Sequence, residues 1–194
     1  MKEESGKGKI IILSAPSGSG KSTIIGELMK KPDLKLGFSI SATSRQPRGT
    51  EKNGREYFFF TEEEFKKNVE AGNFVEWEEV YPGVCYGTLI SEVERITGSG
   101  SNLIMDVDVK GALNIKKRFR DEAITIFIMP PDKQTLEKRL RNRGTDSEET
   151  ILKRLHKSEY EMEFADRFDC VVVNDNLQEA VDNTESKIKD FIKI

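Results

Sequence analysis

The strongest constraint on the fold is a Gly-rich turn that follows a short apolar segment near the start of the chain. Residues 10–13 are Ile-Ile-Ile-Leu, a β-branched apolar run typical of a buried strand. The turn ends in Gly-Lys-Ser-Thr, and residues 23–31 then favour a helix that Pro32 stops. A strand, a Gly-rich turn and a helix in this order direct several backbone N–H groups at one point, where the helix N-terminus adds partial positive charge. Such a point favours an anionic group such as a phosphate.

The turn matches the phosphate-loop pattern of nucleoside triphosphate-binding proteins except at its first position, where Ala15 replaces glycine. Glycines in the loop let the backbone curl close to a ligand, the lysine can reach the β- and γ-phosphates, and the following serine hydroxyl is placed to ligate Mg²⁺. An ordinary Gly-rich turn is the alternative. The residues expected to hold ATP are Ala15, Pro16, Ser17, Gly18, Ser19, Gly20, Lys21, Ser22 and Thr23.

A carboxylate at the end of a neighbouring strand should steady the Mg²⁺ ion or its waters. Asp106 and Asp108 follow the apolar residues 103–105 and suit this role. The alternative is that these aspartates cap a helix or turn near Gly111. We expect the metal ligands to be Ser22 and Asp106, and whether Asp106 contacts Mg²⁺ directly or through water stays open.

Apolar runs recur along the chain and alternate with segments that favour helices. The runs lie at residues 102–106, 123–129 and 170–173, and the helical segments at 110–120, 133–142 and 177–192. Strands that alternate with helices are typical of a parallel, doubly wound α/β sheet. The sequence therefore predicts an α/β protein of the phosphate-loop class.

Residues 38–88 break this alternation. They hold short strand-like pieces at 57–60, 74–78 and 84–86 around a single helix that ends near Gly72. Thr61 can cap that helix, and Glu64 can reach back to form a capping box. We expect one domain over residues 1–194, with a core at 1–37, 89–143 and 155–194, a β-rich insertion at 38–88 and a helical lid at 144–154.

Composition excludes several classes of protein. The 31 basic and 34 acidic residues nearly balance, which gives no indication of a nucleic-acid or membrane partner. Cys85 and Cys170 are far apart and lack the spacing of a zinc or redox motif. The first residues lack a signal-peptide core, and the run at 10–13 is too short to span a bilayer. We therefore expect a cytoplasmic protein.

Arg45 and Arg48 lie three residues apart across a proline within the insertion. This stiff spacing suits two guanidinium groups that close on one phosphate. Taken alone, such a pair more often belongs to a solvated surface turn.

A series of short motifs extends from residue 41 towards the C-terminus. They are Ser-x-x-x-Arg-x-Pro-Arg at 41–48, Asn-Gly-Arg-Glu-Tyr at 53–57, Phe-Val-Glu-Trp at 74–77, Tyr-Gly-Thr at 86–88, Met-Asp-Val-Asp-Val-Lys-Gly at 105–111, Arg-x-x-x-Arg-Gly-Thr at 139–145 and Val-Asn-Asp at 173–175. Together these motifs resemble the guanylate kinase family, in the family's order and approximate spacing, and the likeness runs from about Lys9 to the C-terminus. Ala15 and the pair Gly49-Thr50 depart from the family pattern, but neither supplies a side chain to the chemistry.

The resemblance implies a role for each acceptor-side residue. Those implied to recognise guanine are Ser41, Glu76 and Asp108, with Thr88 as a further base contact, and those implied to hold the GMP phosphate are Arg45, Arg48, Tyr57 and Tyr86. Guanine presents N1–H and N2–H₂ donors beside its O6 acceptor, so a carboxylate and a hydroxyl complement it. Taken singly, Glu76 could lie on a solvated strand face and the two tyrosines could pack in a core.

Arg139 and Arg143 lie four residues apart on one face of a predicted helix, and a small-residue segment separates them from Arg154 on the next helix. Two helices with such a hinge are typical of a lid, although Arg-rich helix faces are often merely solvated. The resemblance assigns these three arginines to the transferring phosphoryl group. Together with Lys21 and Arg45, the expected catalytic residues are therefore Arg139, Arg143 and Arg154. Asn174 resembles the family's adenine-side contact, although a helix cap is the alternative for residues 174–176.

The activity implied is Mg²⁺-dependent transfer of the ATP γ-phosphoryl group to GMP, giving ADP and GDP, in purine nucleotide metabolism. The expected partners are ATP and GMP, with no nucleic acid or membrane, in a monomer or a small homo-oligomer. A phosphopeptide-binding module of the same fold is one alternative, and a kinase for another nucleoside monophosphate is the other. Retention of Lys21 and Ser22 disfavours the first, and Glu76 with Ser41 disfavours the second.

Overall fold

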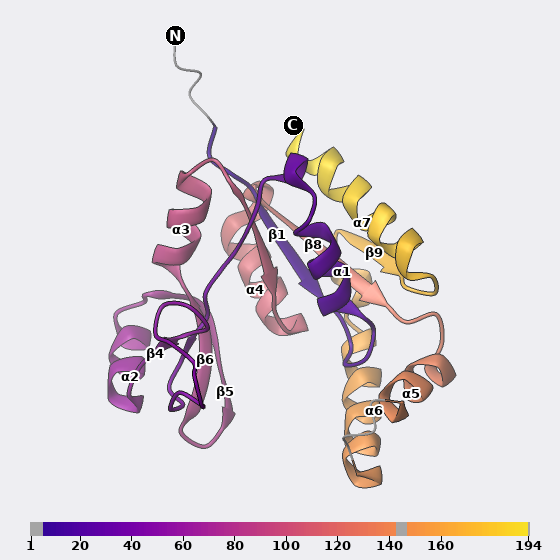
Figure 1. The fold of residues 1–194 in the computed structure, drawn as a ribbon, viewed down its shortest axis with the longest axis horizontal. Coiled ribbons are helices and arrows are strands. Elements are labelled where there is room, and N and C mark those ends of the chain that lie inside the picture. Colours follow the sequence, from indigo (N-terminus) through magenta and orange to yellow (C-terminus); the bar gives the residue numbers. More distant parts are fainter. Residues whose placement is uncertain (1–5, 143–146, 194) are drawn as a thin grey trace. The chain divides into compact units, whose positions relative to one another are not determined.

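The structure is a computed structural model that describes residues 6–142 and 147–193. The chain divides into two compact units. Figure 1 shows the helices and strands of both, with colours that follow the residue number. We call Ile10–Leu36 with Ile104–Ile194 the phosphate-loop unit, and Met1–Lys9 with Gly37–Leu103 the β-lobe unit.

A five-stranded sheet has the strand order β2-β7-β1-β8-β9. The strands are β1 (Ile10–Ser14), β2 (Leu36–Phe38), β7 (Asn102–Asp106), β8 (Ala123–Met129) and β9 (Cys170–Val173). The central strand β1 is buried along its whole length and runs parallel to β8, which in turn runs parallel to β9. This order, with non-consecutive neighbours in parallel, confirms the α/β fold predicted from the alternating apolar runs.

Helices cover both faces of this sheet. The helices of the phosphate-loop unit are α1 (Lys21–Leu28), α4 (Val109–Phe119), α5 (Lys133–Arg141), α6 (Glu148–Met162) and α7 (Leu177–Ile192), with short 3₁₀ turns at Pro32–Leu34, Arg120–Glu122 and Ala165–Arg167. Of these, α1 and α7 lie on one face of the sheet and α4 on the other. Ile11 and Leu13 pack with residues of α1 and α7 in one apolar cluster. Among the described residues, none of α4 belongs to that cluster, yet α4 contacts β1 and β8. Since successive strand residues point to opposite faces, α4 covers the other face of the sheet.

The β-lobe unit is built around a second sheet with the strand order β4-β3-β6-β5. Its strands are β3 (Ala42–Thr43), β4 (Phe58–Phe59), β5 (Phe74–Tyr81) and β6 (Val84–Leu89), and its helices are α2 (Glu62–Glu70) and α3 (Ile90–Gly98). Phe65 of α2 stacks on Phe74 of β5 at a centroid distance of 4.5 Å and anchors the small core of this unit. The predicted insertion at 38–88 lies within this unit, while its exact boundaries and those of the lid stay predictions.

Most of the predicted helices and strands are confirmed, although several begin or end at other residues than predicted. The helix expected from residue 23 begins at Lys21, directly after the loop, and the strand expected at 57–60 is limited to Phe58–Phe59. The sequence analysis missed α3, β2 and β3. Two of these are strands of two or three residues, too short to show a periodicity. No helix of the described residues is both long enough and apolar enough to cross a membrane.

The capping box at the start of α2 is present as predicted. The Thr61 hydroxyl accepts a hydrogen bond from the Glu64 backbone N–H at 3.1 Å, and the Glu64 carboxylate accepts one from the Thr61 N–H at 2.7 Å. We expect Thr61→Ala to lower the free energy of unfolding by about 1 kcal/mol, because one N-terminal N–H of the helix loses its acceptor. Urea denaturation measures this change. The exposed Thr50→Ala serves as the control, and an equal loss in both variants would contradict the role of the cap.

Candidate active site

The turn between β1 and α1 adopts the backbone path that a phosphate loop requires. Gly18 and Gly20 have φ angles of 94° and 86°, in the left-handed region that favours glycine. A Cβ on Gly20 would lie only 2.4 Å from Asn174 Nδ2, so a larger residue there would also force the Asn174 side chain to move. The glycines thus serve both the curl of the loop and its close approach to the end of β9.

A polar cavity of about 410 Å³ opens over this turn. Its walls come from the loop, from the segment after β7 and from the inner side of α6. The residues that line it are Ala15, Pro16, Ser17, Gly18, Ser19, Gly20, Lys21, Ser22, Thr23, Asp106, Val107, Asp108, Lys157 and Glu161. All nine loop residues predicted to hold ATP therefore face one cavity, whereas Asn174, the tenth predicted contact, is not among the residues that line it.

Lys21 and Asp106 form an ion pair across this cavity. Ser22 lines the same space, so a hydroxyl and a carboxylate oxygen lie on its wall. Mg²⁺ prefers oxygen ligands and is usually held by one or two protein groups together with phosphates and water. The donor set of Ser22 and Asp106 fits that ion, and no larger group of metal-ligating side chains occurs among the described residues.

Several polar atoms around the loop are buried without a hydrogen-bond partner. They are Ser19 Oγ, Arg139 Nη1 and Asn174 Oδ1, together with Ser14 Oγ at the end of β1. Native proteins seldom leave such atoms unsatisfied, and a ligand is one of the groups that can satisfy them. The other atoms of these side chains hold them in place, because Asn174 Nδ2 donates to Ser19 O at 2.7 Å and Arg139 Nη2 donates to Asp175 O at 3.4 Å.

Helices α5 and α6 pack against each other, and α6 brings an arginine to the loop. Leu136 and Leu140 of α5 form an apolar cluster with Ile151 of α6. Arg154 of α6 donates from Nη1 to Ser17 Oγ at 3.4 Å. Arg143 and most of the small-residue segment after it lie outside the described residues, so the role of Arg143 stays a prediction.

Glu161 also lines the cavity, and the sequence analysis did not single it out. Only 7% of its surface is exposed, and burial raises the pKa of its carboxyl group, although Lys157 at 3.7 Å acts in the opposite direction. Helical spacing is the signal that identifies it. Residue 161 lies seven positions after Arg154 and therefore on the same face of α6.

The guanine-side residues lie in the β-lobe unit. Glu76 of β5 pairs with Thr88 of β6 in the sheet, and the Thr88 hydroxyl donates to Glu76 Oε1 at 2.7 Å. Glu76 therefore does not lie on a plain solvated strand face. Ser41, which directly precedes β3, is half-buried.

The phosphate-side residues form a second group in the same unit. Tyr57 and Tyr86 meet edge to face with ring centroids 5.8 Å apart. Arg45 Nε donates to the Tyr86 hydroxyl at 3.1 Å, and the Arg45 guanidinium lies 5.0 Å from the Tyr57 ring centroid. Arg48 is exposed on the same loop. The structure thus brings Arg45, Tyr57 and Tyr86 into contact with one another.

Asp108 behaves differently from the other predicted guanine contacts. Its carboxylate caps α4 by accepting hydrogen bonds from the N–H groups of Lys110 at 2.8 Å and Gly111 at 3.1 Å. This is the helix-cap alternative that its position near Gly111 suggested. A contact between Asp108 and guanine stays a prediction.

Burial of Glu161 predicts a change of stability with pH. Its pKa in the folded chain lies above the ordinary value of 4.5, so the folded state holds its proton more tightly than the unfolded state. The wild-type chain therefore loses stability as pH rises from 4.5 through the raised pKa. We expect Glu161→Gln to be more stable than wild type at pH 7 and to lose this advantage at pH 4, as measured by thermal denaturation.

Glu163→Gln is the matched control, because Glu163 is exposed at the end of the same helix. Its stability relative to wild type should change little between the two pH values. A Glu161→Gln variant that gains nothing at pH 7 would contradict the cost assigned to this buried carboxylate.

Comparison with known proteins is consistent with this geometry. The family model for guanylate kinase matches residues 7–191. A guanylate kinase from Porphyromonas gingivalis is 54% identical over 184 residues, which cover 95% of this chain and 98% of the relative.

Solved structures with a similar fold include a member of the same family. The crystal structure of guanylate kinase from Anaplasma phagocytophilum has a TM-score of 0.73 and 28% identity, over 97% of this chain and 88% of that one. The SH3-kinase fragment of tight junction protein 3 has a TM-score of 0.53 at 11% identity, over 97% of this chain and 59% of that one, and shows a shared fold alone. With a family model over nearly its whole length and relatives of this identity, the chain belongs to the guanylate kinase family of ATP:GMP phosphotransferases.

Proposed function

We propose that the chain transfers the γ-phosphoryl group of ATP to GMP with Mg²⁺ as cofactor, giving ADP and GDP. The observation that carries this proposal is the polar cavity over the phosphate loop, where Lys21, Ser22 and Asp106 meet. A cation, a hydroxyl and a carboxylate at the N-terminus of a helix are the groups that a magnesium-bound triphosphate needs.

On the donor side, each loop residue has a distinct task. The backbone N–H groups of the loop bind the phosphates, and Lys21 exchanges its carboxylate partner for β- and γ-phosphate oxygens. Ser22 and Asp106 would hold Mg²⁺, which neutralises charge on those oxygens when it is bound. Asn174, with its buried Oδ1 lacking a partner, offers an acceptor for the adenine amino group.

On the acceptor side, one group of residues binds the base and another binds the phosphate. Glu76 accepts hydrogen bonds from the guanine N1–H and N2–H₂ groups, while Thr88 fixes the orientation of the carboxylate and Ser41 donates to O6. Asp108 is proposed to add a contact to the base. Arg45, Arg48, Tyr57 and Tyr86 bind the phosphate of GMP.

The transfer itself needs positioning and charge neutralisation rather than a general base. The attacking oxygen of GMP is already ionised at neutral pH, unlike the hydroxyl of a sugar or a protein. Arg139 and Arg154, with Arg143, stabilise negative charge on the transferring group. The buried Arg139 Nη1, which has no partner, is available for such a contact.

The phosphopeptide-binding alternative receives less support. A binding module has no use for a lysine at the end of a phosphate loop or for two lid arginines held beside it. Lys21 lies in the loop, Arg154 donates to Ser17 of the loop, and Arg139 donates to Asp175 O, one residue after the Asn174 that binds the loop. The two cysteines are free thiols, in keeping with a proposed cytoplasmic site of purine nucleotide metabolism.

Removal of the loop lysine tests the donor side. We expect Lys21→Ala to lower kcat by about 10²–10³-fold, because charge on the transferring phosphoryl group loses a preorganised donor. Release of ADP in a coupled assay measures the rate, and thermal denaturation checks the fold. Lys30→Ala changes an exposed lysine just after the same helix and should retain wild-type turnover. Near-normal turnover in Lys21→Ala would contradict the loop mechanism.

Exchange of the guanine-binding carboxylate tests the acceptor side. With GMP, AMP, UMP and dTMP as acceptors, the wild-type chain should prefer GMP by roughly 10⁴-fold, because the other bases do not present the adjacent N1–H and N2–H₂ donors that the Glu76 carboxylate accepts. Glu76→Gln should lower kcat/KM for GMP by about 10²-fold and narrow this preference. Glu78→Gln alters an exposed carboxylate two residues along β5 and is the control. An unchanged preference in Glu76→Gln would remove this residue from base recognition.

A further inference from the structure

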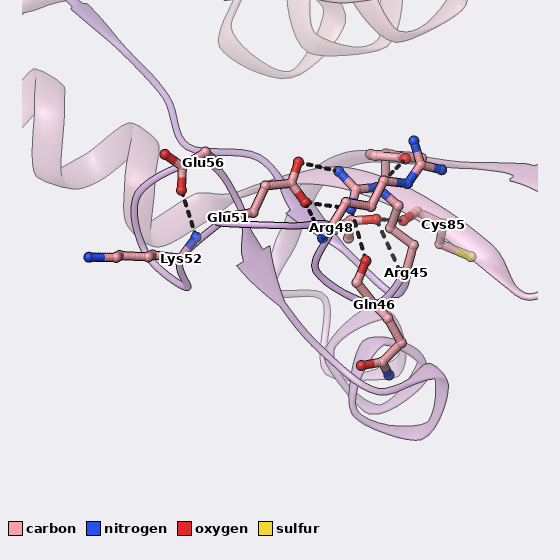
Figure 2. Close-up of polar contacts among 9 residues, drawn as sticks. Arg45, Gln46, Arg48, Glu51, Lys52, Glu56 and Cys85 are labelled. Carbon is pink, nitrogen blue, oxygen red and sulfur yellow. Dashed lines mark hydrogen bonds and ion pairs between the residues drawn. The ribbon is translucent and has the colours of Figure 1, made fainter.

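Arg45 is held by a carboxylate that no motif pointed to. Its guanidinium forms a two-pronged ion pair with Glu51, from Nη1 to Oε2 at 2.7 Å and from Nη2 to Oε1 at 2.8 Å, as Figure 2 shows. The same Oε2 atom accepts a hydrogen bond from the Arg48 backbone N–H at 2.7 Å. One carboxylate therefore contacts both members of the predicted phosphate-binding pair.

The remaining contacts of Arg45 fix its orientation. Nε donates to the Tyr86 hydroxyl at 3.1 Å and Nη1 donates to Gln46 O at 2.9 Å. Together with the two bonds to Glu51, these engage four of the five N–H groups of the guanidinium. The Arg45 side chain is only 10% exposed. Its direction is thus set before any ligand arrives.

Glu51 also shapes the loop that carries the two arginines. Besides its contact with the Arg48 N–H, its own N–H donates to Arg48 O at 3.1 Å. These bonds close residues 45–51 into a compact turn and keep the backbones at 45 and 48 at a constant separation. Hydrogen bonds from Arg45 and Arg48 lower the pKa of the Glu51 carboxyl to about 2, so it stays ionised throughout the neutral range.

We propose that Glu51 is a positioning residue for the phosphate of the acceptor nucleotide, an inference that rests on the proposed function. It does not touch the substrate. It neutralises the largely buried Arg45 cation, whose burial without a partner would be costly, and holds Arg45 in line with the Tyr86 hydroxyl. With Arg45 and Arg48 carrying two positive charges and Glu51 one negative charge, the turn keeps a net positive charge for the phosphate.

The opposite role would be that of a stand-in anion, which occupies the place of the phosphate and leaves when GMP binds. The backbone contact disfavours this role. Displacement of Glu51 would remove the acceptor of the Arg48 N–H and one side of the turn, in addition to breaking a two-pronged ion pair. The two roles predict opposite changes in the affinity for GMP, which makes them separable by experiment.

Glu51→Gln removes the charge and leaves the shape. We expect the KM for GMP to rise about tenfold, because a poorly oriented Arg45 binds the phosphate less well, while the KM for ATP and kcat stay within twofold. The dissociation constant of guanosine, which lacks the phosphate, should not change. Steady-state kinetics and calorimetric titration with GMP and guanosine provide these values.

Glu56→Gln is the matched control. Glu56 lies close to the same loop in Figure 2 and accepts one hydrogen bond from the Lys52 backbone N–H at 2.7 Å, without contacting Arg45. It should retain the wild-type KM for GMP. If Glu51→Gln does not fold, Glu51→Asp keeps the charge at a shorter reach and should weaken GMP but not guanosine.

Four results would overturn the proposal. Tighter binding of GMP by Glu51→Gln would show a stand-in anion, and equal weakening of GMP and guanosine would show a general loss of the lobe's fold. An unchanged KM for GMP, or an equal rise in the Glu56→Gln control, would remove any specific role. Failure of the proposed function is distinguishable, because it would show as a wild-type chain that does not phosphorylate GMP at all.

Discussion

A hydrogen bond from Asn174 Nδ2 to Ser19 O at 2.7 Å ties the phosphate loop to the end of β9. The next residue, Gly20, has a left-handed backbone and no room for a Cβ against the same nitrogen. Asn174 directly follows β9, which pairs with β8, and β8 pairs with the strand that leads into the loop. The sheet therefore holds the loop at two points, through β1, which leads into it, and through Asn174 after β9. The groups proposed to bind phosphate are thus fixed by buried strands.

Both halves of the proposed machinery neutralise a cation before a nucleotide arrives. Lys21 pairs with Asp106 in the phosphate-loop unit, and Arg45 pairs with Glu51 in the β-lobe unit. A partly buried cation without a partner is costly, so each carboxylate stabilises the ligand-free chain. The two pairs differ in geometry. The lysine ammonium is a point charge that can change partners, whereas the planar guanidinium binds its carboxylate at two atoms and is fixed in direction.

The sequence predicted much of the fold because its signals are local. The Thr61 and Glu64 capping box and the apolar run before Gly18 each involve residues a few positions apart. The helix end expected at Pro32 was placed too late, because α1 ends at Leu28 and Pro32 begins a 3₁₀ turn. Local spacing also placed the loop residues correctly around one cavity. It did not reveal β2 and β3, which are too short to show alternation, and it left Asn174 and Asn176 within one group, residues 174–176, for which a helix cap was the alternative. The structure separates them, since Asn176 caps α7 and Asn174 binds the loop.

The sequence by itself determined the order of most strands and helices, apart from β2, β3 and α3, together with the phosphate-loop turn and the family to which these motifs belong, because each signal rests on residues close together in the chain. Only the tertiary structure decided the partners of the charged side chains. Glu51 lies in a stretch without distinctive pattern, yet it holds Arg45. Helix α6 carries several acidic residues, and Glu161 is the one among them that lines the cavity. Which carboxylate meets which cation depends on burial and direction, and these exist only once the chain has folded.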